Sequence, residues 1–335
     1  MPKASIIVVN YNGQDCVIDC LKALKGQLFQ DFEIIVVDNA SSDDSLGEIR
    51  SFLQKSPFTG TVRIIPLEDN LGFAGGNVVG LRYTEAEYIA LLNNDAEPDR
   101  KWLHNLINVM DTEPNVGICA SKMIVAGSRI IDSAGDGHAT LLKGFKRGEG
   151  ESAEKYDLQE YTFGACAGAA LYRRKMLDEI GFFDKEFFLI YEDTDLNFGA
   201  QLAGWKVMYV PTAIVSHKVR STIGHMSEMA IFYSLRNSEL VRIKNLPFLL
   251  FLRCLPVLII GSIFEFLYFA IKYRKPRLYL EAKIDALKSL QGSLRKRKCI
   301  MQMMKKVDNK YLYSIMTPVW NKEFFTMKIK KLIYG

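Results

Sequence analysis

Short apolar runs alternate with helix-like segments along the first part of the chain. Runs rich in Ile, Val and Leu occupy residues 5–10, 33–38, 62–66 and 88–93. Between the first two runs, Val17, Leu21 and Leu24 follow the spacing of one helix face. Strands that alternate with helices of this length predict a mostly parallel sheet covered by helices on both faces. We therefore expect an α/β fold.

Each apolar run leads into a segment rich in Asn, Asp, Ser and Gly. These segments are NYNG, DNASSDD, EDNLGFAGGN and NNDAE, at residues 10–13, 38–44, 68–77 and 93–97. In open parallel sheets, ligands bind beyond the carboxyl ends of the strands, so four such ends predict a ligand site at one edge of the sheet. For any single Asn or Ser, a turn or a helix cap is the alternative.

Two further features are expected in residues 115–220. The stretch SAGDGHATLLKGFKRGEG, at 133–150, is rich in glycine, and we expect a mobile loop there. The acidic run YEDTDL, at 191–196, precedes apolar residues at helical spacing. This pattern predicts a helix that begins near Asp193 and ends at Gly204.

The end of the chain differs in character from the rest. Residues 246–271 are almost entirely apolar, but Arg253, Pro256 and Glu265 interrupt them, which favours a helix in the membrane interface over a membrane span or a core helix. From Ile271 onward there are 17 Lys and Arg against 4 Asp and Glu. Such a basic tail suits an anionic membrane surface, and we expect no nucleic acid partner.

The composition is that of a folded protein, with 49% hydrophobic and 24% charged residues. The six cysteines are scattered without any Cys-x-x-Cys spacing, which indicates reduced thiols and no zinc site. The start MPKASIIVV is too short and too strand-like for a secretory signal. We expect a cytoplasmic protein attached peripherally to the inner face of the cell membrane.

Seven stretches, taken in order, resemble the family 2 glycosyltransferases, which have the GT-A fold. They are VVNYNG, VVDNASSDDS, DNLGFAGGNVVG, LLNNDAEP, GACAGAALYRR, GFFDKEFFLIYEDTDLNFGAQLAGW and SHKVRST. Within the family, the chain is most similar to bacterial rhamnosyltransferase-like enzymes of surface polysaccharide synthesis. The resemblance implies a GT-A domain over residues 1–245, followed by a helical, membrane-associating extension over residues 246–335.

The resemblance also implies a site for a nucleotide-diphospho-sugar donor. Asp38 would accept a hydrogen bond from a pyrimidine ring, and Tyr11 would pack near the base. The other residues predicted for the donor site are Asn10, Asn12, Asn39, Asn70, Gly72, Asn77 and Asn94. The glycines of this segment do not fit G-x-G-x-x-G, which argues against an NAD enzyme.

A diphosphate leaving group carries negative charge that a hard cation stabilises. By resemblance, Asp95 is the retained acid of a degenerate Asp-x-Asp-like signature and binds Mg²⁺ or Mn²⁺ together with His217. An inverting transfer also needs a base for the incoming hydroxyl. The family's Glu-Asp pair falls on Glu192 and Asp193, and we assign the base to Asp193 and acceptor orientation to Glu192. Simple helix capping is the alternative for Asp193, and Arg236 is a candidate phosphate contact.

These expectations combine into an inverting transferase that moves rhamnose from dTDP-rhamnose to a hydroxyl of a lipid-linked saccharide acceptor. Two alternatives stay open, a UDP-sugar-dependent transferase and a degenerate, non-catalytic saccharide-binding protein of the same fold. A sugar-nucleotide pyrophosphorylase would need an early glycine-rich loop with a basic residue, and NYNGQDC has neither.

Overall fold

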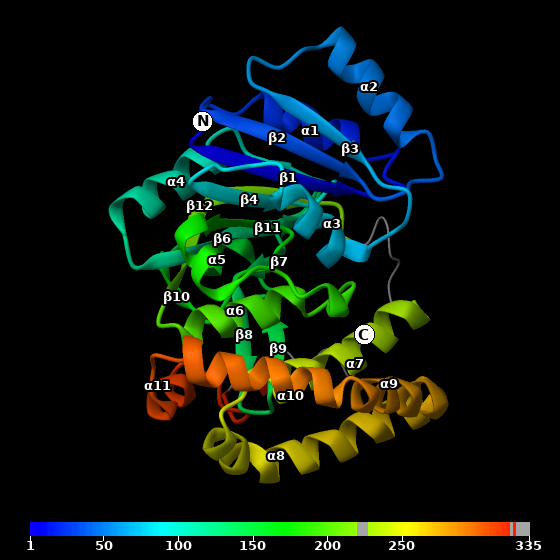
Figure 1. Ribbon diagram of the computed structural model, residues 1–335, viewed down its shortest axis with the longest axis vertical. Helices are drawn as coiled ribbons and strands as arrows, with labels where there is room; N and C mark the ends of the chain where they lie inside the picture. The colour runs from blue at the N-terminus through cyan, green and yellow to red at the C-terminus, as the bar shows by residue number, and fades with distance from the viewer. Residues whose placement is uncertain (220–226, 322–323, 326–335) are drawn as a thin grey trace.

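The computed structural model describes residues 1–219, 227–321 and 324–325. A twisted sheet fills the upper part of the molecule in Figure 1, and the C-terminal helices form a layer at its lower end. The N-terminal strands and the C-terminal helices therefore lie at opposite ends of the long axis.

The sheet is mostly parallel, as the apolar runs predict. Its order is β10-β12-β6-β11-β4-β1-β2-β3, with β5 paired to β12 and β7 paired to β6. The bounds are β1 Ala4–Asn10, β2 Phe32–Asp38, β3 Val62–Pro66, β4 Tyr88–Leu92, β5 Ala96–Pro98, β6 Val116–Val125, β7 Ile131–Ala134, β10 Glu160–Thr162, β11 Ala169–Arg173 and β12 Lys206–His217. Strands β1 to β4 are parallel, and β11 is inserted antiparallel between β4 and β6.

Helices cover both faces of this sheet. The described helices are α1 Val17–Lys25, α2 Ser45–Lys55, α3 Gly72–Leu81, α4 Trp102–Thr112, α5 Arg174–Ile180, α6 Glu192–Leu202, α7 Glu228–Asn245, α8 Phe248–Leu267, α9 Pro276–Lys288, α10 Leu290–Cys299 and α11 Asn309–Ser314. Along β1, Ile6 packs in one apolar cluster with α1 and α4, while Ile7 packs in a second cluster with α3 and α5. Burial on both faces explains why these strands are continuous apolar runs.

The glycine-rich stretch is a β-hairpin, so the expectation of a mobile loop at 133–150 is wrong for these residues. Strands β8 Asp136–Ala139 and β9 Lys143–Lys146 pair antiparallel, with Asp136 opposite Lys146. A Cβ atom on Gly137 would lie 2.3 Å from the ring of Phe145, so this glycine makes room for an aromatic side chain. Glycine here serves close packing within a sheet, which composition alone does not distinguish from a loop.

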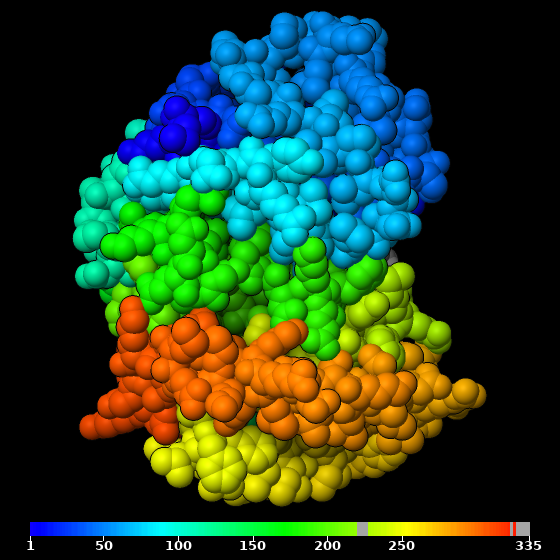
Figure 2. All heavy atoms as spheres, viewed as in Figure 1, coloured from blue at the N-terminus to red at the C-terminus, as the bar shows by residue number. Residues whose placement is uncertain are grey.

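The C-terminal helices share an apolar cluster with the helix that carries the acidic run. Leu240 and Leu250 pack in this cluster together with Phe198 and Leu202 of α6. Helix α9 lies along α7, and α8 forms the lower edge of the molecule in Figure 2. The layer thereby covers α6 and the β8–β9 hairpin from below.

The contact of α3 with β1 supplies a test of the packing. Gly80 of α3 lies against Ile7, whose Cγ2 atom would be 2.6 Å from an added Cβ. We expect Gly80→Val to lower the free energy of unfolding by about 1–3 kcal/mol through overpacking. Gly292→Ala is the control, because nothing lies near that exposed helical glycine, and it should raise stability by up to about 1 kcal/mol. Urea unfolding measures both; equal stability of Gly80→Val and the native protein would contradict the close contact.

Candidate active site at the carboxyl edge of the sheet

The side chain of Asn10 joins the ends of three strands. Its Nδ2 donates to Asp38 Oδ1 at 3.0 Å and to Ser45 Oγ at 2.8 Å, and its Oδ1 accepts from Asn94 Nδ2 at 3.0 Å. All four residues are buried. The ends of β1, β2 and β4 therefore meet at one edge of the sheet, as the sequence predicts.

A second set of amide contacts shapes the loop that enters α3. Asn39 Nδ2 donates to Asn70 Oδ1 at 2.8 Å and to the carbonyl of Gly72 at 3.2 Å. Asn39 Oδ1 accepts from the backbone of Leu71 at 2.9 Å. Gly72 has a φ of +70°, and a Cβ there would meet the carbonyl of Phe188 at 2.4 Å. Only glycine fits this position without strain.

The remaining residues predicted for the donor site take separate positions. Asn12 Oδ1 accepts from the backbone of Ser42 at 2.8 Å, which ties the end of β1 to the loop after β2. Tyr11 is partly exposed at 36%. Asn77 is buried within α3, where its amide donates to the carbonyl of Phe73 at 2.9 Å. The hydrogen bond of Asn77 thus stays within its own helix.

Asp95 and His217 lie together, as expected of a shared metal site. His217 Nε2 is 3.1 Å from Asp95 Oδ1, and its Nδ1 is 2.9 Å from Asp132 Oδ2. Lys146 in turn donates to both oxygens of Asp132, at 2.8 and 2.9 Å. Residues 220–222, the end of the SHKVRST motif, lie outside the described residues.

The imidazole of His217 lies between two carboxylates, which favour its protonated form. Burial lowers its pKa, but the hydrogen bonds with Asp132 and Asp95 outweigh burial and raise the pKa to about 9. Burial likewise opposes ionisation of Asp132, yet His217 and the charge of Lys146 lower its pKa to about 2. The site therefore favours a cation between Asp95 and Asp132.

The pair Asp95 and His217 fits a divalent cation. Two ligand atoms about 2.1 Å from an octahedral ion lie about 3.0 Å apart when adjacent, close to the 3.1 Å between Nε2 and Oδ1. Within the described ranges no group of three or more His, Cys, Asp or Glu side chains is arranged around one point. Ions such as Mg²⁺ are commonly held by one or two protein ligands, with phosphate oxygens and water completing the shell.

The acidic pair lies at the start of α6. Asp193 is partly exposed; its Oδ2 accepts from Ala167 N at 3.3 Å and its Oδ1 from Thr194 N at 2.6 Å. Glu192 is buried, and its Oε2 has no hydrogen-bond partner in the described part of the chain. Burial raises the pKa of both carboxyls, and the charge of Asp193 raises that of Glu192 further. Tyr191, not an acid, occupies the N-cap position, and Asp193 lies in the first turn of α6.

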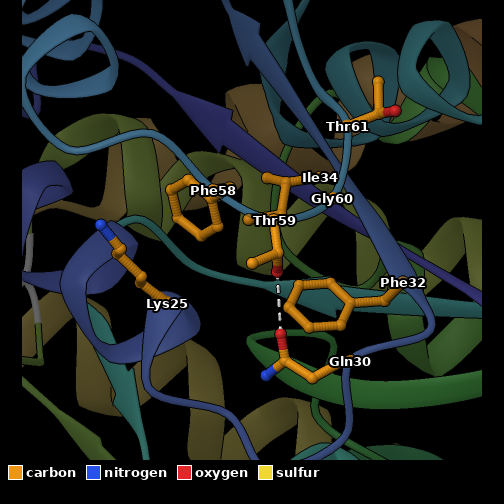
Figure 3. Close-up of a pocket in the computed structure, with 8 residues that line it drawn as sticks. All are labelled: Lys25, Gln30, Phe32, Ile34, Phe58, Thr59, Gly60 and Thr61. Atoms are coloured by element: carbon orange, nitrogen blue, oxygen red, sulfur yellow. Dashed lines mark hydrogen bonds between the residues drawn. The ribbon is translucent and has the colours of Figure 1, made fainter.

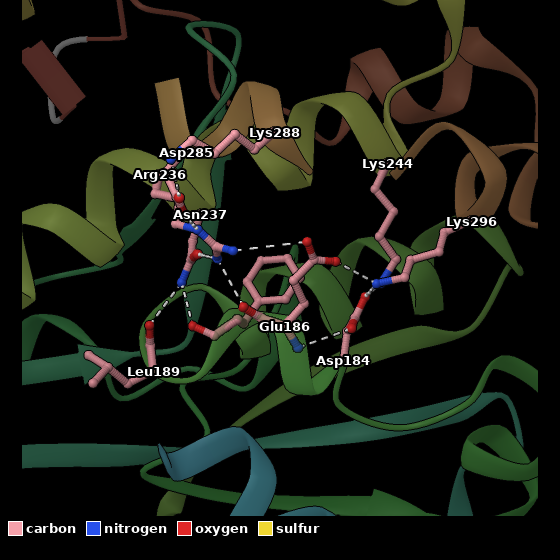
Figure 4. A network of polar contacts seen from close by, with 10 residues as sticks. Asp184, Glu186, Leu189, Arg236, Asn237, Lys244, Asp285, Lys288 and Lys296 are labelled. Atoms are coloured by element: carbon pink, nitrogen blue, oxygen red, sulfur yellow. Dashed lines mark hydrogen bonds and ion pairs between the residues drawn. The ribbon is translucent and has the colours of Figure 1, made fainter. Parts of the chain in front are cut away.

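A network from α7 holds the loop that precedes α6 (Figure 4). Asn237 Nδ2 donates to the carbonyls of Phe187, Leu189 and Ile190. Arg236 donates to Asp285 Oδ2 at 2.7 Å and to the carbonyl of Glu186 at 2.9 Å. The structure thus gives Arg236, our candidate phosphate contact, a set of protein partners that fix the backbone leading to Glu192 and Asp193.

Two cavities are lined by residues other than Asp95 and His217. One, of about 80 Å³, is lined by Phe32, Phe58 and neighbouring residues, with Thr59 donating to Gln30 at its rim (Figure 3). It is too small for a nucleotide. The other, of about 720 Å³, is bordered by Asp136, Phe145 and other residues of the β8–β9 hairpin and the loop after it.

Sequence reasoning missed three charged residues near the predicted site. Asp132 contacts His217 and Lys146 contacts Asp132. Burial and the charge of Asp193 raise the pKa of Asp136 well above its usual value. Lys146 and Asp136 lie in the stretch that we expected to be a loop, and Asp132 directly precedes it. The alternation of charged and small residues in IIDSAGDG and KGFKRG was the available sign of paired strands.

Comparisons with known proteins identify similar sequences. The model of the family described as Glycosyl transferase family 2 matches residues 5–181, more than half of the chain. The N-acetylglucosaminyl-diphospho-decaprenol L-rhamnosyltransferase of Mycobacterium tuberculosis is 26% identical over 215 residues, which are 56% of this chain and 67% of that protein. The low-salt glycan biosynthesis hexosyltransferase Agl10 of Haloferax volcanii is 22% identical over 203 residues, 59% of this chain and 61% of that protein.

A solved structure shares the fold. GalNAc-T7, crystallised with UDP, GalNAc and Mn²⁺, superposes with a TM-score of 0.62 at 14% sequence identity, over 90% of this chain and 56% of that one. The chain thus spans only part of the length of these proteins, 61% for Agl10 and 56% for GalNAc-T7.

The proximity of Asp95 and His217 predicts that divalent cation binding depends on both side chains. We expect Asp95→Ala and His217→Ala each to weaken Mn²⁺ binding strongly in calorimetric titration, because each change removes one of the two protein ligands. Glu97→Ala is the control, since Glu97 pairs with Lys218 and does not contact His217. Because Nε2 must lose a proton to bind a metal, affinity should be higher at about pH 8 than at about pH 6. Equal Mn²⁺ binding by Asp95→Ala would contradict the assignment.

Proposed function

The chain belongs to glycosyl transferase family 2 and has the GT-A fold, and on this premise we propose that it is an inverting, metal-dependent hexosyltransferase. It moves rhamnose from dTDP-rhamnose to a hydroxyl of a lipid-linked saccharide during cell-surface polysaccharide synthesis. The observation that carries the proposal is the meeting of Asp38, Asn10 and Asn94 at the strand ends. The Asp95 and His217 pair and the acids of α6 complete it.

The choice of sugar rests on the relative from Mycobacterium tuberculosis, whose name describes an L-rhamnosyltransferase with a lipid-linked acceptor. The structural neighbour crystallised with UDP supports a UDP-sugar as the second candidate donor. Both donors contain a pyrimidine, which is consistent with Asp38 as a hydrogen-bond acceptor for the base.

In this proposal the strand-end residues bind and orient the donor. Asp38 faces the base, with its carboxylate held by Asn10 Nδ2 and by Ser41 Oγ at 2.6 Å. The loop set by Asn39, Asn70 and Gly72 leads into the N-terminus of α3, where the helix dipole favours the negative charge of a phosphate. A bound Mg²⁺ or Mn²⁺ supplies positive charge that stabilises the leaving diphosphate, and Asp95 and His217 would hold it.

Asp193 removes the proton of the acceptor hydroxyl. It is the more exposed of the two acids, and the N–H groups of Ala167 and Thr194 fix the orientation of its carboxylate. Its raised pKa makes it a better proton acceptor near neutrality than an ordinary Asp. In this proposal Glu192 orients the acceptor from its buried position next to Asp193.

Residues 246–335 bring this site to a membrane surface. One segment within the described residues, Phe248–Lys272, is long and apolar enough to cross a membrane by length and composition, and only 6% of it is buried. The face of α8 that turns away from the protein carries large apolar side chains, namely Phe248, Leu249, Leu252, Ile259, Ile260, Ile263, Phe264 and Leu267. The exposed Lys272 and Arg274 follow directly.

The opposite face of α8 is attached to the rest of the protein. Leu250 and Cys254 are buried in the apolar cluster beneath α6. Glu265 pairs with Lys143 of β9, and Arg253 lies over the ring of Tyr313, 3.6 Å from its centroid. A spanning helix would have to leave these partners, whereas a helix lying flat keeps them and buries its outer face. This geometry supports an in-plane anchor with cations near anionic head groups.

The base assignment predicts a separation of turnover from binding. Asp193→Asn should lower turnover by roughly 10²- to 10⁴-fold because the proton acceptor is lost, while calorimetry should still detect donor binding. Asp195→Asn is the matched control on the same helix. Asp195 pairs with Lys244 and Asn245, so this change should lower the unfolding midpoint and spare turnover at low temperature. Loss of donor binding in Asp193→Asn would remove the base assignment.

The anchor predicts binding to anionic vesicles. The double change Ile260→Glu and Ile263→Glu should abolish co-sedimentation with vesicles of phosphatidylglycerol and phosphatidylcholine. The two substitutions place charge on the face of α8 that the membrane would bury. Leu158→Glu is the control, since Leu158 is 79% exposed but lies far along the chain from α8. Native protein should bind pure phosphatidylcholine more weakly. Unchanged sedimentation of the double variant, or a native dimer that α8 substitutions dissociate, would contradict the anchor.

A further inference from the structure

Asp132 contacts the candidate metal ligand from the side opposite to Asp95. It lies on β7, is only 4% exposed, and its Oδ2 is 2.9 Å from His217 Nδ1. Once Nε2 has lost its proton, an imidazole whose Nδ1–H donates to a carboxylate presents the Nε2 lone pair to a metal ion. Here Nε2 points at Asp95. The order Asp132, His217, Asp95 therefore sets both the tautomer and the direction of the ring.

Lys146 holds Asp132 in turn. Its ammonium group contacts both carboxylate oxygens, at 2.8 and 2.9 Å, so the carboxylate cannot rotate without losing one of them. Lys146 ends β9, and the adjoining backbone is fixed by hydrogen bonds from Ala134 to Arg147 and from Arg147 to Gly135. The β8–β9 hairpin therefore holds the ammonium group of Lys146 in a fixed position against Asp132, behind His217.

A buried ion pair of this kind has a purely structural explanation as well. Charged groups out of water need partners, and a pair that merely satisfies itself contributes little net stability. The structural explanation does not require one of the carboxylate oxygens to face a histidine. Among the described residues, Lys122 and Asp157 form a Lys–Asp pair without a histidine, in which the lysine is buried and the aspartate exposed, and this pair supplies the comparison.

We infer that Asp132 and Lys146 form a positioning pair that orients His217 for divalent cation binding. This inference rests on the proposed function, in which His217 binds the cation. It adds two residues that hold this ligand in place. Asp132 acts through His217 and does not touch the cation. Carboxylates that orient a ligating histidine change metal affinity by about 10- to 100-fold when they are removed.

The test measures Mn²⁺ affinity by calorimetry in the full chain without any donor. Asp132→Asn should weaken Mn²⁺ binding about 10- to 100-fold. Since this change leaves Lys146 without a carboxylate, the double variant Asp132→Asn/Lys146→Met removes both charges together and should show the same loss. Asp157→Asn, which breaks the comparison pair, should bind Mn²⁺ like the native protein. Thermal unfolding of each variant reports whether the fold is kept.

A spectroscopic measurement separates positioning from a structural role. In the Mg²⁺-loaded native protein, ¹⁵N NMR of His217 should show the proton on Nδ1, and the double variant should lose this single-tautomer signal. Native Mn²⁺ affinity in a folded double variant, or an equal loss in Asp157→Asn, would overturn the inference, as would a native protein that binds no Mn²⁺. If the native protein binds Mn²⁺ but transfers no sugar, the proposed function fails while the positioning pair stands.

Discussion

The hydrogen bonds of one buried asparagine hold the candidate active site together. Asn10 reaches the ends of β2 and β4 from the end of β1, and it can do so because these parallel strands finish at the same edge of one sheet. Asn10, Asp38 and Asn94 are buried, so each needs a partner, and the neighbouring strand end supplies it. The donor-binding residues in our proposal are therefore preorganised by the sheet itself.

The charged side chains around His217 also need partners, and they find them in segments far apart in the sequence. His217, Asp132 and Lys146 come from β12, β7 and β9, and each compensates a charge that would be costly to bury alone.

Charge pairing also determines the character of α8. Glu265 pairs with Lys143 and the exposed Arg253 lies over the ring of Tyr313, while large apolar side chains make up most of the outer face. The hairpin that carries Lys146 to the site also carries Lys143 to this helix. One short segment therefore connects the candidate metal site with the proposed membrane anchor.

The sequence by itself determined the features that depend on local pattern. The runs of Ile and Val fixed the strands to within a residue or two, and the polar segments after them located Asn10, Asp38 and Asp95 at the strand ends. The acidic run and Gly204 predicted α6, because periodicity and caps are written in adjacent residues. Tertiary structure alone decided that Asp132 and Lys146 stand behind His217 and that Glu265 of α8 pairs with Lys143. These features depend on partners as much as about 120 residues away, and no local pattern records which distant charge will satisfy a buried one.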